Sequence, residues 1–183
     1  MLLSYNQIHA LLLDKVVEHA EPENVNGASL DIRLGPELLL ESQPSFHSGK
    51  DVISLREREK PLMRKWVMNP EQGYIIKPGE FLLAHSIEVF NLPLHISCEF
   101  KLKSSCARIG INQLTACWCD PGWHGSHITL ELTNTMRYHS VLVRPGDKIG
   151  QIVFFAHEPV PEERSYKVRG RYNNDKTVEG IKL

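Results

Sequence analysis

The sequence lacks the features that mark membrane and secreted proteins. No apolar run approaches the roughly 18 residues of a membrane-spanning helix. The first residues, MLLSYNQIHALLLDK, have neither a basic start nor a small-residue cleavage site, so they do not resemble a secretory signal. Only four cysteines occur in 183 residues, which is not the density of a disulfide scaffold. We therefore expect a cytoplasmic protein with reduced thiols and no membrane partner.

Several common catalytic and nucleotide-binding motifs are also missing. The chain has no Walker loop, no G-x-G-x-x-G fingerprint and no G-x-S-x-G nucleophile elbow. The P-C-x-x-C segment of the zinc nucleobase deaminases is absent as well. These absences argue against a P-loop NTPase, a Rossmann dehydrogenase, an α/β-hydrolase and a zinc deaminase.

Neither sign of charge is in excess. Lys and Arg total 21, Asp and Glu total 22, and the formal net charge is −1, which argues against a protein that coats a nucleic acid polymer. The charge is unevenly distributed, because residues 101–108 carry three basic and no acidic groups, and residues 164–176 carry five basic groups and one acid. The near-neutral total therefore does not exclude a site for one anionic small molecule.

The apolar pattern predicts one mainly β domain over residues 1–183. Ser4 followed by Gln7 is a capping-box pattern that predicts a helix over residues 5–15. Alternation predicts a strand over residues 28–34, and we interpret residues 42–73 as a solvated loop or insertion. From residue 74 on, short apolar runs alternate with Pro-Gly turns at residues 77–80, 120–123 and 144–147, which suggests a compact barrel or sandwich. The C-terminal tail, about residues 160–183, is either a lid or a frayed end.

Two segments carry candidate chemistry. Residues 101–108 combine three cations with two hydroxyls, a set suited to phosphate oxygens. If residues 127–132 form a strand, His127, Thr129 and Glu131 share one face, opposite an apolar face. A carboxylate facing a partly dry cavity has a raised pKa and exchanges protons near neutral pH.

Two alternatives stay open at this point. Cys117, Cys119, His124 and His127 are ligands that zinc accepts, although Cys-x-Cys is a poor chelating spacing. The basic tail over residues 164–176 is interleaved with tyrosines, a pattern also found in RNA-binding segments. A solvated basic loop and ordinary buried cysteines are the competing interpretations.

Taken in order, four segments resemble the dCTP deaminase family within the dUTPase-like superfamily. They are residues 25–35, residues 103–110, the run from Thr115 and Ala116 through residues 120–123 to residues 129–131, and residues 144–151. The resemblance implies a dUTPase-like β-clip barrel with a short N-terminal helix, assembled as a homotrimer with active sites at subunit boundaries. It also implies hydrolytic deamination of dCTP to dUTP and ammonia, with dUTP and dTTP as further possible ligands.

The resemblance implies roles for individual residues. Glu131 matches the proton-shuttling glutamate, Ser104 and Arg108 match a serine and an arginine near the base, and the Ala116 carbonyl orients the water or the amine. Asp120 falls where an aspartate meets the deoxyribose 3′-hydroxyl. The implied substrate-binding residues are Lys103, Ser104, Ser105, Cys106, Ala107, Arg108, Asp120, Thr129, Leu130, Glu131, Tyr166, Arg171 and Asp175. Mg²⁺ would bind through the substrate triphosphate, and no catalytic zinc is expected.

The sequence departs from the family pattern at several positions. Cys117-Trp118-Cys119 replaces the usual residues, Lys103 replaces an arginine, and Asp175 stands where a glutamine is expected. The loss of a guanidinium fork at Lys103 and of an amide at Asp175 affects two expected phosphate contacts.

Two further functions share this fold. A bifunctional deaminase–diphosphatase would form dUMP with the same Glu131 and Asp120, and a non-catalytic regulator would bind nucleotide without turnover. A bulky residue follows Ala116 where a glycine often follows in bifunctional members, so the sequence favours the dUTP-forming deaminase.

Overall fold

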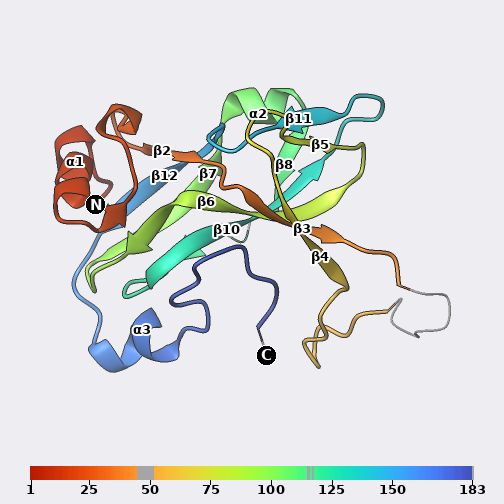
Figure 1. Cartoon of the computed structure of the whole chain (residues 1–183). Helices are drawn as coiled ribbons and strands as arrows, with labels where there is room; N and C mark the ends of the chain where they lie inside the picture. The colour runs from red at the N-terminus through yellow and green to blue at the C-terminus, as the bar shows by residue number, and fades with distance from the viewer. Residues whose placement is uncertain (45–51, 115, 117, 183) are drawn as a thin grey trace.

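The computed structural model describes residues 1–44, 52–114, 116 and 118–182, and its architecture is mainly β (Figure 1). The helices are α1 (Tyr5–Leu13), α2 (Ser104–Arg108) and α3 (Tyr166–Arg169), with 3-10 turns η1 (Pro22–Asn24) and η2 (Glu162–Arg164). The strands are β1 (Val17–Glu18), β2 (Leu30–Arg33), β3 (Glu37–Glu41), β4 (Met63–Val67), β5 (Tyr74–Ile76), β6 (Phe81–Asn91), β7 (Ile96–Leu102), β8 (Ile111–Gln113), β9 (Trp118–Cys119), β10 (His124–Asn134), β11 (Val141–Val143) and β12 (Lys148–Ala156). No helix within these described ranges has the length and apolar character needed to cross a membrane.

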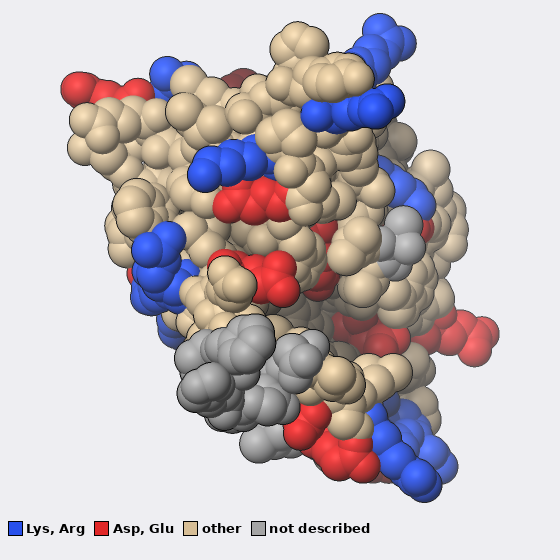
Figure 2. Space-filling view, turned by 90° about the vertical axis from the view of Figure 1, so that its right-hand side faces the viewer, with Lys and Arg blue, Asp and Glu red and all other residues tan. Residues whose placement is uncertain are grey.

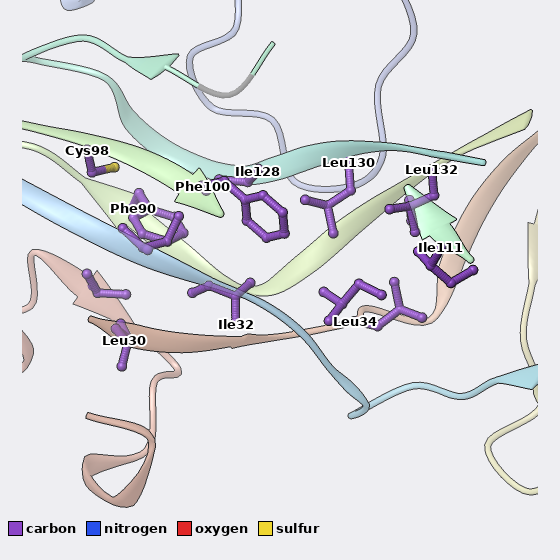
Figure 3. Close-up of a cluster of buried hydrophobic side chains, with 14 of the residues drawn as sticks. Leu30, Ile32, Leu34, Phe90, Cys98, Phe100, Ile111, Ile128, Leu130 and Leu132 are labelled. Atoms are coloured by element: carbon purple, nitrogen blue, oxygen red, sulfur yellow. The ribbon is translucent and has the colours of Figure 1, made fainter. Parts of the chain in front are cut away.

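Two larger sheets and a small one enclose the core. One sheet has the order β4-β3-β6-β10-β8, with β1 added to β6; the second has the order β2-β12-β7-β9; β5 and β11 pair separately. In Figure 3, Ile128, Leu130 and Leu132 of β10 lie over side chains from β2 and β7, and all three are at most 4% exposed. Because each fully buried aliphatic side chain stabilises the fold by about 1.5–3 kcal/mol, this cluster holds β10 rigidly in place.

The predicted N-terminal helix is confirmed, with an earlier end. The Ser4 backbone N–H donates to the Gln7 side chain at 3.0 Å, completing the capping box. Ile8 is fully buried, which fixes the helix against the sheets. The helix ends at Leu13 because Lys15 adopts a left-handed backbone with φ +55°.

The three Pro-Gly turns are confirmed as tight turns. Gly79, Gly122 and Gly146 have φ of +76°, +85° and +91°, the conformation that a type II turn requires at its third position. The Glu80 and Asp147 backbone N–H groups close their turns onto Lys77 O and Arg144 O. The first and third turns follow β5 and β11, which pair with each other, so the two similar segments lie side by side.

Residues 28–34 contain the predicted strand, but the interpretation of residues 42–73 as a solvated loop is wrong in part. Residues 63–67 form β4, which pairs along the whole of β3. This strand is an exposed edge with almost no buried side chain, so its sequence lacks the alternation by which strands are detected. The residues just before it, Leu62 and Lys60, reach the cavity described below.

The C-terminal tail is docked, so the frayed-end alternative is wrong for the described residues. After α3 the chain runs back beneath β10 in Figure 1. Backbone bonds join Asn174 N–H to His124 O at 3.0 Å and His127 N–H to Asp175 O at 3.0 Å. The tail therefore lies against the first half of β10.

Candidate active site

A cavity of about 780 Å³ lies between the β3–β6–β10 face and the C-terminal tail. Its described lining residues come from segments far apart in the chain. Those of the sheet and the 116–123 segment are Leu39, Phe81, Leu83, Ala116, Trp118, Cys119, Asp120, Trp123, His127, Ile128, Thr129 and Glu131. Those of the 60–63 segment and the tail are Lys60, Pro61, Leu62, Met63, Tyr166, Tyr172, Asp175, Glu179, Gly180, Ile181 and Lys182.

Strand alternation decides which β10 side chains reach the cavity. Thr129 and Glu131 line it, whereas Leu130 between them is 0% exposed in the core. The expected polar face is therefore confirmed for Thr129 and Glu131, whereas Ile128, expected on the apolar face, also lines the cavity next to an irregularity in the strand. The Leu130 side chain faces away from the cavity, so it does not contact a ligand there.

Glu131 stands on an apolar floor. Its partner on β6 is Leu83, whose partner on β3 is Leu39, and all three line the cavity. Burial raises the pKa of the Glu131 carboxyl above its ordinary value, and hydrogen bonds from its own backbone N–H and from Gln113 offset only part of that rise. A carboxyl that has a raised pKa and is partly shielded from solvent is suited to accepting and returning a proton.

Asp120 lies at the edge of the same cavity, after the short strand β9. The Trp118 indole Nε1–H donates to Asp120 Oδ1 at 3.0 Å. Trp118 is itself 56% exposed and contacts the Phe155 ring, with centroids 5.8 Å apart. The indole thus orients one carboxylate oxygen, and among the described residues the other oxygen has no hydrogen-bond donor.

The tail forms one wall of the cavity through specific hydrogen bonds. The Trp123 indole donates to Tyr172 O at 2.6 Å, and the buried Ser126 hydroxyl donates to the same carbonyl at 2.9 Å. The Asp175 N–H in turn donates to Ser126 Oγ at 3.0 Å. Asp175 is 5% exposed and forms an ion pair with Lys182, so its carboxylate is neutralised within the tail.

Two histidines pack together at the cavity wall, where His127 lines the cavity and His85 lies behind it. The rings of His85 and His127 meet edge to face with centroids 4.9 Å apart. Burial lowers the pKa of both imidazoles below the ordinary value. Burial therefore disfavours a positive charge on either ring.

Residues 103–108 do not line the cavity of their own chain. Ser104, Ser105 and Arg108 are exposed on α2, which lies far from the tail in Figure 1, and Arg171 is exposed outside the cavity. Lys103 instead forms an ion pair with Asp31 at 2.7 Å. A single chain thus brings together Ala116, Asp120, Thr129, Glu131, Tyr166 and Asp175, but not the basic segment.

Part of the zinc hypothesis falls outside the described residues. Cys117 and Thr115 are not described, Cys119 and His127 line the cavity, and His124 lies elsewhere. Within the described ranges, no group of three or more His, Cys, Asp or Glu residues is placed to hold a metal ion.

Comparison with known proteins places the chain in a family. A family model described as dCTP deaminase-like matches residues 2–157. The chain belongs to the dCTP deaminase-like family. It resembles proteins named "dCTP deaminase, dUMP-forming" from Nanoarchaeum equitans, at 34% identity over 96% of this chain and 94% of that protein, and from Aquifex aeolicus, at 34% identity over 97% and 92%. The expectation of an enzyme of this family is confirmed.

The fold expected of a dCTP deaminase-like protein is also confirmed. The crystal structure of 2′-deoxycytidine 5′-triphosphate deaminase from Agrobacterium tumefaciens superposes with a TM-score of 0.64 at 24% identity. The match covers 84% of this chain and 48% of that longer chain, so this chain spans about half of it.

Sequence reasoning missed several residues of the site. Gln113, which contacts Glu131, belongs to no recognised motif, and Leu62 and Met63 lie in the segment interpreted as a loop. Tyr172 was considered only as one of the tyrosines of the basic tail and not as a residue of the site. Trp123 belongs to the recognised motif Asp120-Pro121-Gly122-Trp123, but the motif does not indicate that the Trp123 indole binds the tail.

Proposed function

We propose that this chain deaminates dCTP and converts the product further to dUMP. The half-buried Glu131 carboxyl, facing a cavity large enough for a nucleotide, is the observation that carries the deamination. The residue pattern after Ala116 predicted dUTP as the final product. The names of the curated relatives support the dUMP-forming alternative better, and we adopt it.

Deamination requires water to attack C4 of cytosine and ammonia to leave. Glu131 takes one proton from the attacking water as the C4–O bond forms and passes it to N3. It then takes the second proton of that oxygen and delivers it to the exocyclic amine as the C4–N bond breaks. One water is consumed, dUTP and ammonia are released, and Glu131 returns to its starting state. Aligning water and carboxylate in this way contributes several kcal/mol toward the barrier.

The second reaction consumes another water. It breaks the bond between the α-phosphorus and the bridging oxygen of dUTP and releases dUMP and pyrophosphate. We assign the phosphates to Lys103, Ser104, Ser105 and Arg108, and the deoxyribose 3′-hydroxyl to the free oxygen of Asp120. Mg²⁺ carried by the triphosphate would offset its charge.

This assignment requires an oligomer, for which we propose the homotrimer expected from the family resemblance. Residues 103–108 lie outside the cavity of their own chain, so a neighbouring copy has to supply them for the site to be complete. In a closed ring each copy gives its α2 segment to the next cavity, which generates equivalent sites.

Product analysis tests the proposal. The protein is incubated with dCTP and Mg²⁺, and dUTP, dUMP, pyrophosphate and ammonia are resolved by chromatography and a coupled assay. We expect ammonia and dUMP in equal amounts, and Glu131→Gln should abolish ammonia release while dCTP still binds. A zinc chelator should leave the rate unchanged when Mg²⁺ is in excess.

Other outcomes identify the other functions. Accumulation of dUTP without dUMP would support the monofunctional deaminase favoured by the bulky residue after Ala116. Tight dCTP binding with no product would overturn both enzymatic proposals in favour of a nucleotide-binding regulator. Loss of activity on zinc removal would revive the metal hypothesis.

A further inference from the structure

Gln113 contacts the Glu131 carboxyl from the neighbouring strand. Its side-chain Nε2 lies 2.6 Å from Glu131 Oε2, and Gln113 is only 7% exposed. It stands at the end of β8, where Gln113 pairs with Leu132. The strand end is tied down at the same point, because the Leu114 N–H donates to Glu131 O at 3.0 Å.

A second contact fixes the orientation of the Gln113 amide. The same Nε2 donates to Leu114 O at 3.2 Å. A backbone carbonyl only accepts hydrogen bonds, so the amide must turn its NH₂ group toward Leu114 O and hence toward Glu131 Oε2. The assignment of amide nitrogen and oxygen therefore follows from chemistry, independently of how the two atoms are drawn.

We propose that Gln113 is a positioning residue that makes the two oxygens of Glu131 unequal. Oε2 is held as a hydrogen-bond acceptor, because a proton on it would face the NH₂ group of Gln113. The proton exchanged during the reaction is therefore carried on Oε1. This inference rests on the proposed deamination, and it adds Gln113 to the residues expected near Glu131.

The contact with Gln113 also affects the pH range over which Glu131 is ionised and can react. Burial raises the pKa of this carboxyl, and donation from Gln113 favours the ionised form and lowers it again. Glu131 must be ionised to take a proton from water. Gln113 thus extends the active range of the site toward lower pH.

Other ionisable groups line the cavity and belong in any account of its pH dependence. The acids are Asp120, Asp175 and Glu179, the bases are Lys60, His127 and Lys182, and Cys119 contributes a thiol. Tyr166 and Tyr172 also contribute phenols. Asp175 and Lys182 neutralise each other in an ion pair. The facing residues of β3 and β6, Leu39 and Leu83, are uncharged.

Two substitutions at Gln113 and one control test the proposal. Gln113→Met keeps the length of the side chain and removes the donor, and Gln113→Glu keeps its shape and replaces the donor with a carboxyl. Asn112→Ala removes an exposed amide from the same strand and serves as the control. Ammonia release from dCTP is measured from pH 4 to 9, and kcat and KM are determined at each pH.

We expect the acid limb of the kcat/KM profile to move to higher pH by about one unit in Gln113→Met, and further in Gln113→Glu. In Gln113→Met, kcat at neutral pH should fall at least tenfold with KM changed less than threefold. Asn112→Ala should superimpose on the unmodified protein.

Every other outcome has a defined meaning. Suppose that the unmodified protein is active. The inference is then overturned if the acid limb of Gln113→Glu, whose side chain closely matches the native one in shape, lies at the same pH as that of the unmodified protein. The same result in a folded Gln113→Met would also overturn it. A fall in melting temperature with an unmoved limb would assign Gln113 a structural role alone. An unmodified protein that releases no ammonia would instead reject the proposed function.

Discussion

Asp31 shows how one buried carboxylate ties together residues that the sequence analysis treated separately. It is 4% exposed and contacts Lys103 at 2.7 Å, Lys148 at 3.3 Å and Asn26 at 2.9 Å. Burial acts to raise the pKa of Asp31, but the bonds and charges of these partners outweigh it and lower the pKa below 3.8. In one chain, Lys103 of the basic segment is thus held by an acid of β2.

The lowered pKa of Asp31 gives a prediction about acid stability. A carboxyl whose pKa is lower in the folded state stabilises the protein above the unfolded pKa, near 4, and loses that contribution as the pH falls through the folded value. Asp31→Asn should cost about 1–3 kcal/mol at pH 7. Its melting temperature should also depend less on pH between 5 and 3 than that of the unmodified protein.

Thermal melts at several pH values provide the measurement, and Asp14→Asn provides the control. Asp14 is exposed after the last residue of α1. Equal losses in both variants, or an unchanged acid slope in Asp31→Asn, would contradict a stabilising role for the Asp31 ion pairs.

Sequence reasoning at the residue level succeeded where the pattern was local. The separation of Thr129 and Glu131 from Leu130 needed only the two-residue period of a strand, and the structure shows it. The contact of Gln113 with Glu131 depends on the register between β8 and β10. No alternation or motif in one segment encodes that register.

At the level of elements, the tail is the part whose role the sequence left most open. Its charge pattern indicated an anionic ligand, but its docking depends on backbone carbonyls that no side-chain pattern reveals. The edge strand β4 was missed for a related reason, because exposed edge strands lack an apolar face. Helix α1 and the Pro-Gly turns were predictable, because capping residues and turn glycines act locally.

Ser126 gives a test of tail docking. Its hydroxyl donates to Tyr172 O and accepts from the Asp175 N–H, so Ser126→Ala should release this wall of the cavity. Loss of two such bonds should raise KM for dCTP about tenfold, with a smaller change in kcat. Limited proteolysis should also cleave the tail faster.

Ser140→Ala is the matched control, because Ser140 is exposed between β10 and β11. An unchanged KM together with unchanged proteolysis of the tail in Ser126→Ala would show that the tail is held by other contacts.

For the whole molecule, the location of α2 outside the cavity predicts sharing of sites between copies. Glu131→Gln and Arg108→Ala should each be inactive alone. When the two chains are co-expressed and form mixed rings at random, about a quarter of the sites combine an intact Glu131 with an intact Arg108 of the neighbour. Activity should return to about that fraction.

Ammonia release from the purified mixture provides the measurement, with each variant co-expressed with itself as the control. A mixture as inactive as its components would mean that each site draws both residues from one chain.

The distribution of charge is consistent with a small ligand. On the face in Figure 2, basic and acidic groups are interspersed, with acidic groups toward the middle. This matches the formal net charge of −1. The overall charge was predictable from composition, whereas the incompleteness of the cavity in one chain was expected only from the family resemblance.

The docking of the tail on β10 has a consequence for the order of assembly during synthesis. Residues 172–182 leave the ribosome well after Glu131. Until then the side chains of Trp123 and Ser126 lack the Tyr172 carbonyl to which they donate in the folded protein. The core sheets of a nascent chain can form first, with Glu131 in place over an open floor. The cavity acquires its last wall only as translation passes the tail, so a chain stalled before residue 172 would fold without a closed site.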